Sequence, residues 1–269
     1  MRRLGCRGIA AWACFAAGVG CLGAQEAGAA RNLWSGKSGE YSIQWTASNL
    51  KVTQGERTVY DAAAAAKAAW ADMVRKSNGI AMEAQFTYRL LSAVGPYLSV
   101  EEGVFCDCGG AHPTAVTRFR ATDLRGAKKS DASLTAIFPE GAVYKALSTD
   151  GVVTKALGED AKPKTWADLI DTLQDKTAKV KDCEYAFPED IASRFAFYGY
   201  EAGNAAVRIG LPNASEVCRG QSTQLGLTLA APAGLKAELE SAKAKRSGAL
   251  MADVPKDAET KFSFSQKRK

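Results

Sequence analysis

A chain of 269 residues that is 46% hydrophobic and 24% charged can bury a full core, and this length is typical of one domain rather than two. The composition indicates a soluble globular protein. Three of its arginines lie within the first seven residues, so the formal net charge of +6 falls to about +3 if that segment is removed. The remaining basic residues near the C-terminus are typical of a solvated helix end and tail, and we favour this interpretation over a nucleic-acid patch.

Residues 1–29 have the three parts of a secretory signal peptide. The start is basic, the apolar run from Ile9 to Leu22 is shorter than the ~20 residues that span a bilayer, and the end is rich in small residues. Two processing routes remain open. Cleavage after Ala24 or Ala29 would release a periplasmic protein, whereas lipidation of Cys21 would leave a membrane-anchored lipoprotein, although Gly18 stands where a larger aliphatic residue is usual.

Strand and helix patterns follow the leader along the chain. Residues 41–52 predict a first strand, and residues 61–79 an alanine-rich helix that Asp61 can cap. Residues 81–123 form β-rich runs whose short connections favour antiparallel neighbours. Helices are predicted at 133–158, at 164–176, where Thr165 and Asp168 have capping-box spacing, and at 232–246. The strands between them are predicted at residues 193–201, 204–212 and 222–232.

This order predicts an α+β fold with a mainly antiparallel sheet and packed helices in a single domain. We place the domain at residues 30–246 and expect residues 247–269 to form a basic, loosely ordered tail.

Four cysteines remain after the leader: Cys106, Cys108, Cys183 and Cys218. Outside the cytoplasm such cysteines form disulfides, and four cysteines allow three connectivities. A bridge between Cys106 and Cys108 needs a bend, because residues two apart on a strand are ~6.6 Å apart. Gly109 and Gly110 permit one. We favour Cys106 with Cys108 and Cys183 with Cys218.

The stretch "VFCDCGGAHP" also contains His112, the single histidine of the chain. Three interpretations are open. Cys106, Cys108 and His112, with Asp107, resemble a metal-ligand set, but the usual unit is Cys-x2-Cys. A cysteine nucleophile with His112 as its general base is disfavoured, because a cysteine sulfur held in a disulfide cannot attack a substrate. We favour a structural turn in which His112 is half-buried and bonds a neighbouring strand.

Signatures of other enzymes are missing from the sequence. It has no Gly-x-Ser-x-Gly elbow, no His-Glu-x-x-His motif and no phosphate-binding glycine loop. We therefore predict no catalytic residue, no cofactor and no metal.

The segment "SAVGPYLSVEEG…GGAHP…RFRATDLRGAKKSDASLTAIF" resembles the extracytoplasmic domain of the RsiV family of anti-sigma factors. That family has a strand ending in Gly-Gly-Ala-His, which Gly109 to His112 match. A following Asp-Leu-x-x-Gly-Lys pattern is approximated, with altered spacing, by Asp123, Leu124, Gly126 and Lys128. Tyr200, Glu201, Leu211 and Pro212 are similar to its later motifs, so the resemblance covers about residues 41–235. The domain also occurs fused to polysaccharide deacetylases and alone in exported proteins.

The resemblance implies a non-enzymatic α+β binding domain of the cell envelope. In the anti-sigma factors it engages lysozyme, so its candidate partners are an envelope protein such as a lysozyme-like muramidase, or peptidoglycan. We expect neither a sigma-binding segment nor a deacetylase domain here, and the paired cysteines lie outside the family pattern. The candidate binding residues are Tyr97, Glu101, Glu102, Asp107, Gly109, Gly110 and His112.

Because this chain has a net positive charge, binding of a cationic lysozyme would require a local acidic patch on its surface. Glu101, Glu102 and Asp107 are the candidates for that patch. Two alternatives to a binding module stay open. One is a protein that hydrolyses, or helps to deacetylate, cell-wall glycan or peptide. The other is a structural envelope protein without a dedicated site.

Overall fold

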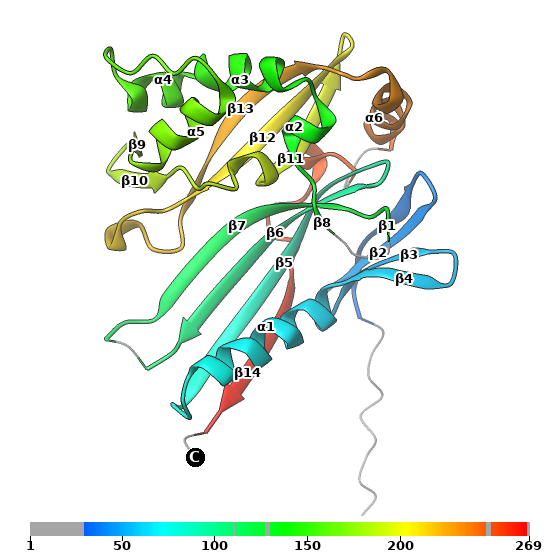
Figure 1. Cartoon of the computed structure of the whole chain (residues 1–269). Coiled ribbons are helices and arrows are strands. Elements are labelled where there is room, and N and C mark those ends of the chain that lie inside the picture. The colour runs from blue at the N-terminus through cyan, green and yellow to red at the C-terminus, as the bar shows by residue number, and fades with distance from the viewer. Residues whose placement is uncertain (1–29, 110, 127–129, 246–248, 268–269) are drawn as a thin grey trace, which may run out of the picture.

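A five-stranded antiparallel sheet forms the centre of the protein, with its strands in the order β14-β5-β6-β7-β8. The computed structural model describes residues 30–109, 111–126, 130–245 and 249–267. The strands of this sheet are β5 (Met82–Val94), β6 (Tyr97–Asp107), β7 (Thr114–Asp123), β8 (Ser130–Asp131) and β14 (Thr260–Gln266). Figure 1 shows β5, β6 and β7 as the long strands of the molecule. The predicted antiparallel runs between residues 81 and 123 are confirmed.

The N-terminal part forms a second antiparallel sheet followed by a helix. Its strands are β1 (Asn32–Ser38), β2 (Tyr41–Thr46), β3 (Leu50–Gln54) and β4 (Arg57–Asp61), and the helix is α1 (Ala62–Lys76). The single first strand predicted over residues 41–52 is wrong, because a turn after Thr46 splits it into β2 and β3. Asp61 caps α1 as predicted, and its carboxylate accepts a hydrogen bond from the Ala64 backbone N–H.

A third sheet contains β11 (Phe195–Glu201), β12 (Asn204–Pro212) and β13 (Ser222–Ala230), where strands were predicted. The helices around it are α2 (Leu134–Ile137), α3 (Glu140–Ser148), α4 (Gly151–Leu157), α5 (Trp166–Gln174) and α6 (Lys236–Ala244). Thr165 and Asp168 form the predicted capping box of α5. A small hairpin of β9 (Thr177–Val180) and β10 (Cys183–Ala186) follows α5.

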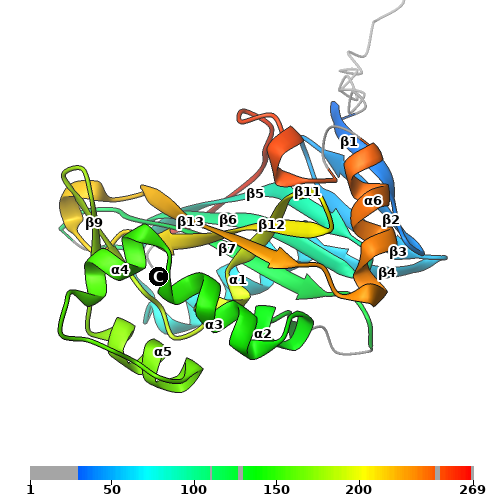
Figure 2. The ribbon, with the colours of Figure 1, turned by 90° about the horizontal axis from the view of Figure 1, so that it is seen from above.

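The elements stack in layers. Helices α2 to α5 cover one face of the three-stranded sheet and bury the largest core cluster, which includes Phe195, Phe197 and Val207 (Figures 1 and 2). The other face of that sheet packs on the five-stranded sheet, where Ala196 meets Phe119. The opposite face of the five-stranded sheet joins α1 and the β1–β4 sheet in a second core. The fold is therefore α+β and mainly antiparallel, as predicted.

The C-terminal segment is part of the central sheet. The expectation that residues 247–269 form a loosely ordered tail is wrong, because β14 pairs with β5 along its whole length. Phe262 and Phe264 contact the core beneath α1, whereas Lys261, Ser263 and Ser265 are exposed. This alternation of apolar and polar residues is the pattern of a half-buried strand.

Candidate functional site

The turn between β6 and β7 is closed by a disulfide between Cys106 and Cys108, as predicted. Their Cα atoms are 5.4 Å apart, closer than two residues on an extended strand, because the chain bends after Asp107. Gly109 follows with φ of +78°, and a Cβ atom there would lie 2.6 Å from a methyl group of Ile80. The turn thus requires glycine at this position. Gly110, also a predicted binding residue, lies outside the described residues.

His112 is exposed and lines a cleft of about 890 Å³. The prediction that it is half-buried against a neighbouring strand is wrong. One wall of the cleft is the start of β7, which contributes Thr114 and Val116. The opposite wall is the connection from β12 to β13, which contributes Val217 and Arg219.

The connection from β12 to β13 is fixed by the second predicted disulfide, between Cys183 and Cys218. The backbone N–H of Ala214 also donates to the carbonyl of Glu184 at 2.7 Å. Gly220 lies against β7, because a Cβ atom at this glycine would be 3.4 Å from that of Ala115. A disulfide therefore borders each side of the cleft.

Large apolar side chains are exposed around the cleft. Val217 is 86% exposed and Val116 is 45% exposed. Both residues line the cleft, so its lining includes two exposed apolar side chains. Sequence reasoning missed Val217 and Arg219, because they are about one hundred residues from His112 and only the packing of β12 against β7 brings them near.

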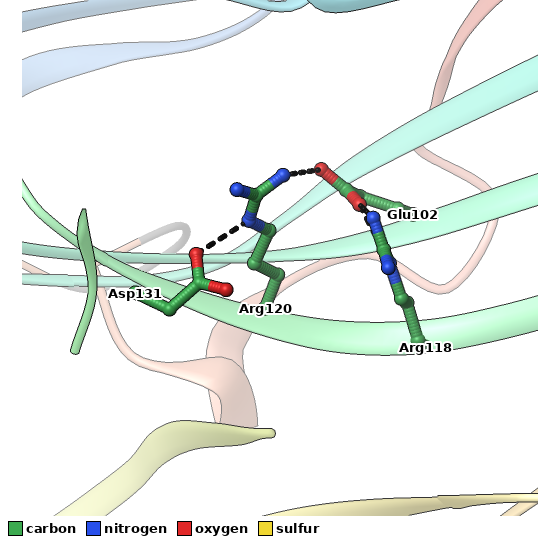
Figure 3. A network of polar contacts seen from close by, with 4 residues as sticks. All are labelled: Glu102, Arg118, Arg120 and Asp131. Carbon is green, nitrogen blue, oxygen red and sulfur yellow. Dashed lines mark hydrogen bonds and ion pairs between the residues drawn. The ribbon is translucent and has the colours of Figure 1, made fainter. Parts of the chain in front are cut away.

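The predicted acidic patch does not form. Glu101 and Glu102 are consecutive in β6, so their side chains point to opposite faces of the sheet. Glu101 pairs with Arg89 at 2.8 Å. Glu102 is buried and accepts hydrogen bonds from Arg118 at 2.9 and 2.7 Å, as Figure 3 shows. Asp107 is exposed at the end of β6.

The Glu102 carboxylate is the centre of a polar network beneath α1. Its second oxygen lies 3.6 Å from the guanidinium of Arg120, which also donates to Asp131 at 2.7 Å (Figure 3). Tyr88 lies opposite Glu102 in β5. Burial raises the pKa of the Tyr88 hydroxyl, and the negative charge of Glu102 raises it further. The carboxylates and the two guanidiniums pair with one another, so we assign the network to stability.

Tyr97 lies at the other end of β6, away from the cleft. Its ring is buried and packs against Phe197 in the largest core cluster. Its hydroxyl accepts a hydrogen bond from Arg125 at 2.9 Å, and the same guanidinium binds Asp123 and lowers the pKa of that carboxyl. The predicted binding set therefore splits: Asp107, Gly109 and His112 lie at the turn end of the sheet, and of these three His112 lines the cleft.

No cluster of three or more potential metal-ligating side chains occurs within the described ranges. In this part of the chain no helix combines the length and the apolar character that crossing a bilayer requires. The two disulfides indicate an oxidising compartment. The predicted signal peptide and Cys21 lie outside the described residues.

Comparisons with protein-family models, curated proteins and solved structures found no match to this chain. The fold and the cleft together define an α+β protein with an open, disulfide-bordered cleft.

Proposed function

We propose that the protein is an exported binding module of the cell envelope and that the cleft beside His112 holds an envelope protein. The observation that carries the proposal is that two exposed apolar residues, Val217 and Val116, line one cleft. Apolar residues that are exposed together favour a protein partner, because burying them on binding is favourable by roughly 25 cal/mol per Å².

The charge of the cleft bears on the choice of partner. The lining residues that the structure places include Arg219 and His112 but no carboxylate. The acids expected to attract a cationic lysozyme-like muramidase are paired with arginines or dispersed. As the candidate partner, we therefore rank an envelope protein of another kind above a muramidase. Peptidoglycan remains a candidate ligand, and the experiment below tests it directly.

The test uses the mature protein, produced in an oxidising compartment and immobilised. Three samples are applied at low salt: a cationic lysozyme, purified peptidoglycan, and detergent-solubilised envelope of the native cell. The variant Val217→Asp places a charge on the exposed wall. The matched control is Tyr198→Asp, which alters another exposed apolar residue on β11, away from the cleft.

We expect one envelope protein to be retained by the unmodified protein and by the Tyr198 variant, with at least about tenfold lower retention on Val217→Asp. Equal retention on all three proteins would remove the cleft from the proposal. Retention of lysozyme that Val217→Asp abolishes would identify a muramidase as the partner, and the same result with peptidoglycan would reassign the ligand class.

A further inference from the structure

The two disulfides differ in the length of chain that each one closes. Cys183 and Cys218 are 35 positions apart, whereas Cys106 and Cys108 are two positions apart. In the chain-entropy model a disulfide stabilises a fold by restricting the unfolded chain, and the restriction grows with the number of residues between the cysteines. The short bridge therefore stabilises the fold less than the long one.

The end of β6 is held by the sheet as well as by the short bridge. Cys106 lies opposite Ala84 of β5 and Thr114 of β7, so both neighbouring strands fix its position. By thermodynamic linkage, a bridge that adds little to the stability of the fold gains little stability from the fold in return. We expect this bridge to be reduced at a higher potential than Cys183–Cys218, a property that labile and catalytic disulfides share.

The two halves of the short bridge differ in exposure. Cys106 is 2% exposed and belongs to the core shared with α1. Cys108 is partly exposed, and its neighbours Asp107 and Gly109 are exposed. Figure 1 shows this end of β6 extending below the layer of helices α2–α5. A thiolate that approaches from solvent therefore reaches the sulfur of Cys108, and Cys106 is the leaving sulfur.

Exposed apolar side chains adjoin the bridge. Phe105 directly precedes Cys106 and is 50% exposed. Ile80 is 41% exposed and lies against the turn, because a Cβ atom at Gly109 would be 2.6 Å from one of its methyl groups. Removal of apolar surface from water is favourable, so these side chains favour a polypeptide that exposes apolar residues of its own. A chain that has reached an oxidising compartment but has not finished folding exposes such residues together with unpaired cysteines.

We propose that the Cys106–Cys108 bridge is a redox-active disulfide that oxidises pairs of cysteines in incompletely folded polypeptides. The sulfur of Cys108 receives the polypeptide thiolate, and Phe105 and Ile80 contact the apolar residues of the polypeptide. This activity is a second function of the protein. It is separate from the retention of an envelope protein beside His112 and does not rest on it.

The reaction transfers two electrons from the polypeptide to the bridge. A thiolate of the polypeptide attacks Sγ of Cys108, the S–S bond breaks, and its electron pair leaves with Sγ of Cys106, which takes up a proton from water. A second thiolate of the polypeptide then attacks the polypeptide sulfur of the mixed disulfide and releases Cys108 as a thiolate, which is protonated in turn. One disulfide forms in the polypeptide, and the bridge becomes a dithiol.

The first measurement compares the two bridges in the unmodified protein. The mature protein is equilibrated with mixtures of reduced and oxidised glutathione, free thiols are alkylated, and each bridge is identified by peptide mass spectrometry. We expect the equilibrium constant for reduction by glutathione to be at least about tenfold larger for Cys106–Cys108 than for Cys183–Cys218. Equal constants, or easier reduction of Cys183–Cys218, would overturn the proposal.

The second measurement is a single turnover with reduced, unfolded ribonuclease A in the absence of oxygen. We expect the substrate to lose about two thiols for each molecule of protein that carries the short bridge. The variant with both Cys106→Ser and Cys108→Ser should leave the substrate thiols unchanged. The matched control, with both Cys183→Ser and Cys218→Ser, keeps the short bridge and should oxidise the substrate to the same extent.

A peptide with a single cysteine shows which sulfur is attacked, and it requires no variant, so it decides the question even if the serine variants do not fold. After acid quenching, the mixed disulfide should map to Cys108. The double variant Ile80→Ser with Phe105→Ser tests the apolar surroundings. It should oxidise unfolded ribonuclease A at least about threefold more slowly, whereas its rate with reduced glutathione should stay within about twofold of that of the unmodified protein.

The proposal is overturned if the unmodified protein does not oxidise ribonuclease A, if oxidation persists without Cys106 and Cys108, or if the mixed disulfide maps to Cys106. Unchanged oxidation of ribonuclease A by the Ile80 and Phe105 double variant would overturn the assignment of an unfolded polypeptide as the substrate. No envelope sample enters these measurements. Their failure would leave the Val217-dependent retention standing, and loss of that retention would leave this activity standing.

Discussion

Glu102 shows how one buried charge depends on its neighbours. The residue is 8% exposed, and its carboxylate lies between Arg118 and Arg120 of the adjacent strand. A buried charge is tolerated when it is paired and hydrogen-bonded. The register of β6 against β7 places Glu102 directly opposite Arg118 and so supplies that partner. The residue is thus a packing element of the sheet rather than part of a binding patch.

Replacement of this carboxylate tests the assignment. Glu102→Gln leaves the two guanidiniums beside a neutral amide, and we expect the free energy of unfolding to fall by about 2 kcal/mol. This is below the usual loss for a buried pair, because both arginines remain half-exposed. Asp72→Asn, which breaks an exposed ion-pair cluster on α1, should leave the free energy of unfolding nearly unchanged, because solvent screens those charges. Urea unfolding measures both, and equal losses would contradict the assignment.

At the level of single residues, the sequence predicted local features well. The cap at Asp61 and the capping box at Thr165 depend on residues within three positions of one another, and both are present. The exposure of His112 depends on what packs against its turn, and the sequence alone could not supply that.

Strand β14 is the element whose role the sequence concealed. Its side chains alternate between the core beneath α1 and solvent. Phe264 stacks on Trp70 and meets Phe86 edge-on, each with ring centroids 5.6 Å apart. Thr260 receives a hydrogen bond from the indole N–H of Trp45 at 3.1 Å. The strand therefore joins the C-terminus to both α1 and the N-terminal sheet.

Removal of the Phe264 ring measures how much these contacts of β14 contribute to stability. Phe264→Ala removes two aromatic contacts, and we expect a loss of about 2 kcal/mol in the free energy of unfolding, because the ring is half-buried. Ser263→Ala alters the exposed side of the same strand and should change stability by less than about 0.5 kcal/mol. A neutral Phe264→Ala in thermal or urea unfolding would show that β14 is dispensable.

The whole molecule depends on a close approach of two sheets. Gly210 of β12 lies over the ring of Phe119 in β7, and a Cβ atom at this glycine would be 2.7 Å from the ring. Nearby, the buried hydroxyl of Ser92 accepts a hydrogen bond from the backbone N–H of Phe197 at 3.0 Å. These contacts fix the position of the three-stranded sheet and, through it, that of the β12–β13 wall of the cleft.

A single methyl group added at this contact should lower the stability of the whole fold. Gly210→Ala forces the sheets apart or displaces Phe119, and we expect a loss of about 1–3 kcal/mol in the free energy of unfolding. Gly141→Ala, in helix α3 with open space around the position, should instead stabilise the protein by about 0.5–1 kcal/mol. Calorimetry compares the two variants. The same sign for both would argue against tight packing between the sheets.

The α+β class, the antiparallel run of β5 to β7 and the disulfide at the Cys106 turn could be predicted from the sequence alone. Each of these depends on neighbouring residues: short connections, alternation along a strand, and glycine beside two close cysteines. Which surfaces are exposed depends on how the sheets pack. This packing pairs Glu102 with arginines of the next strand, adds β14 to the sheet edge beside β5, and places Val217 and His112 in the lining of one cleft. Local patterns do not encode such placements, because they arise when whole sheets pack and bury their apolar faces.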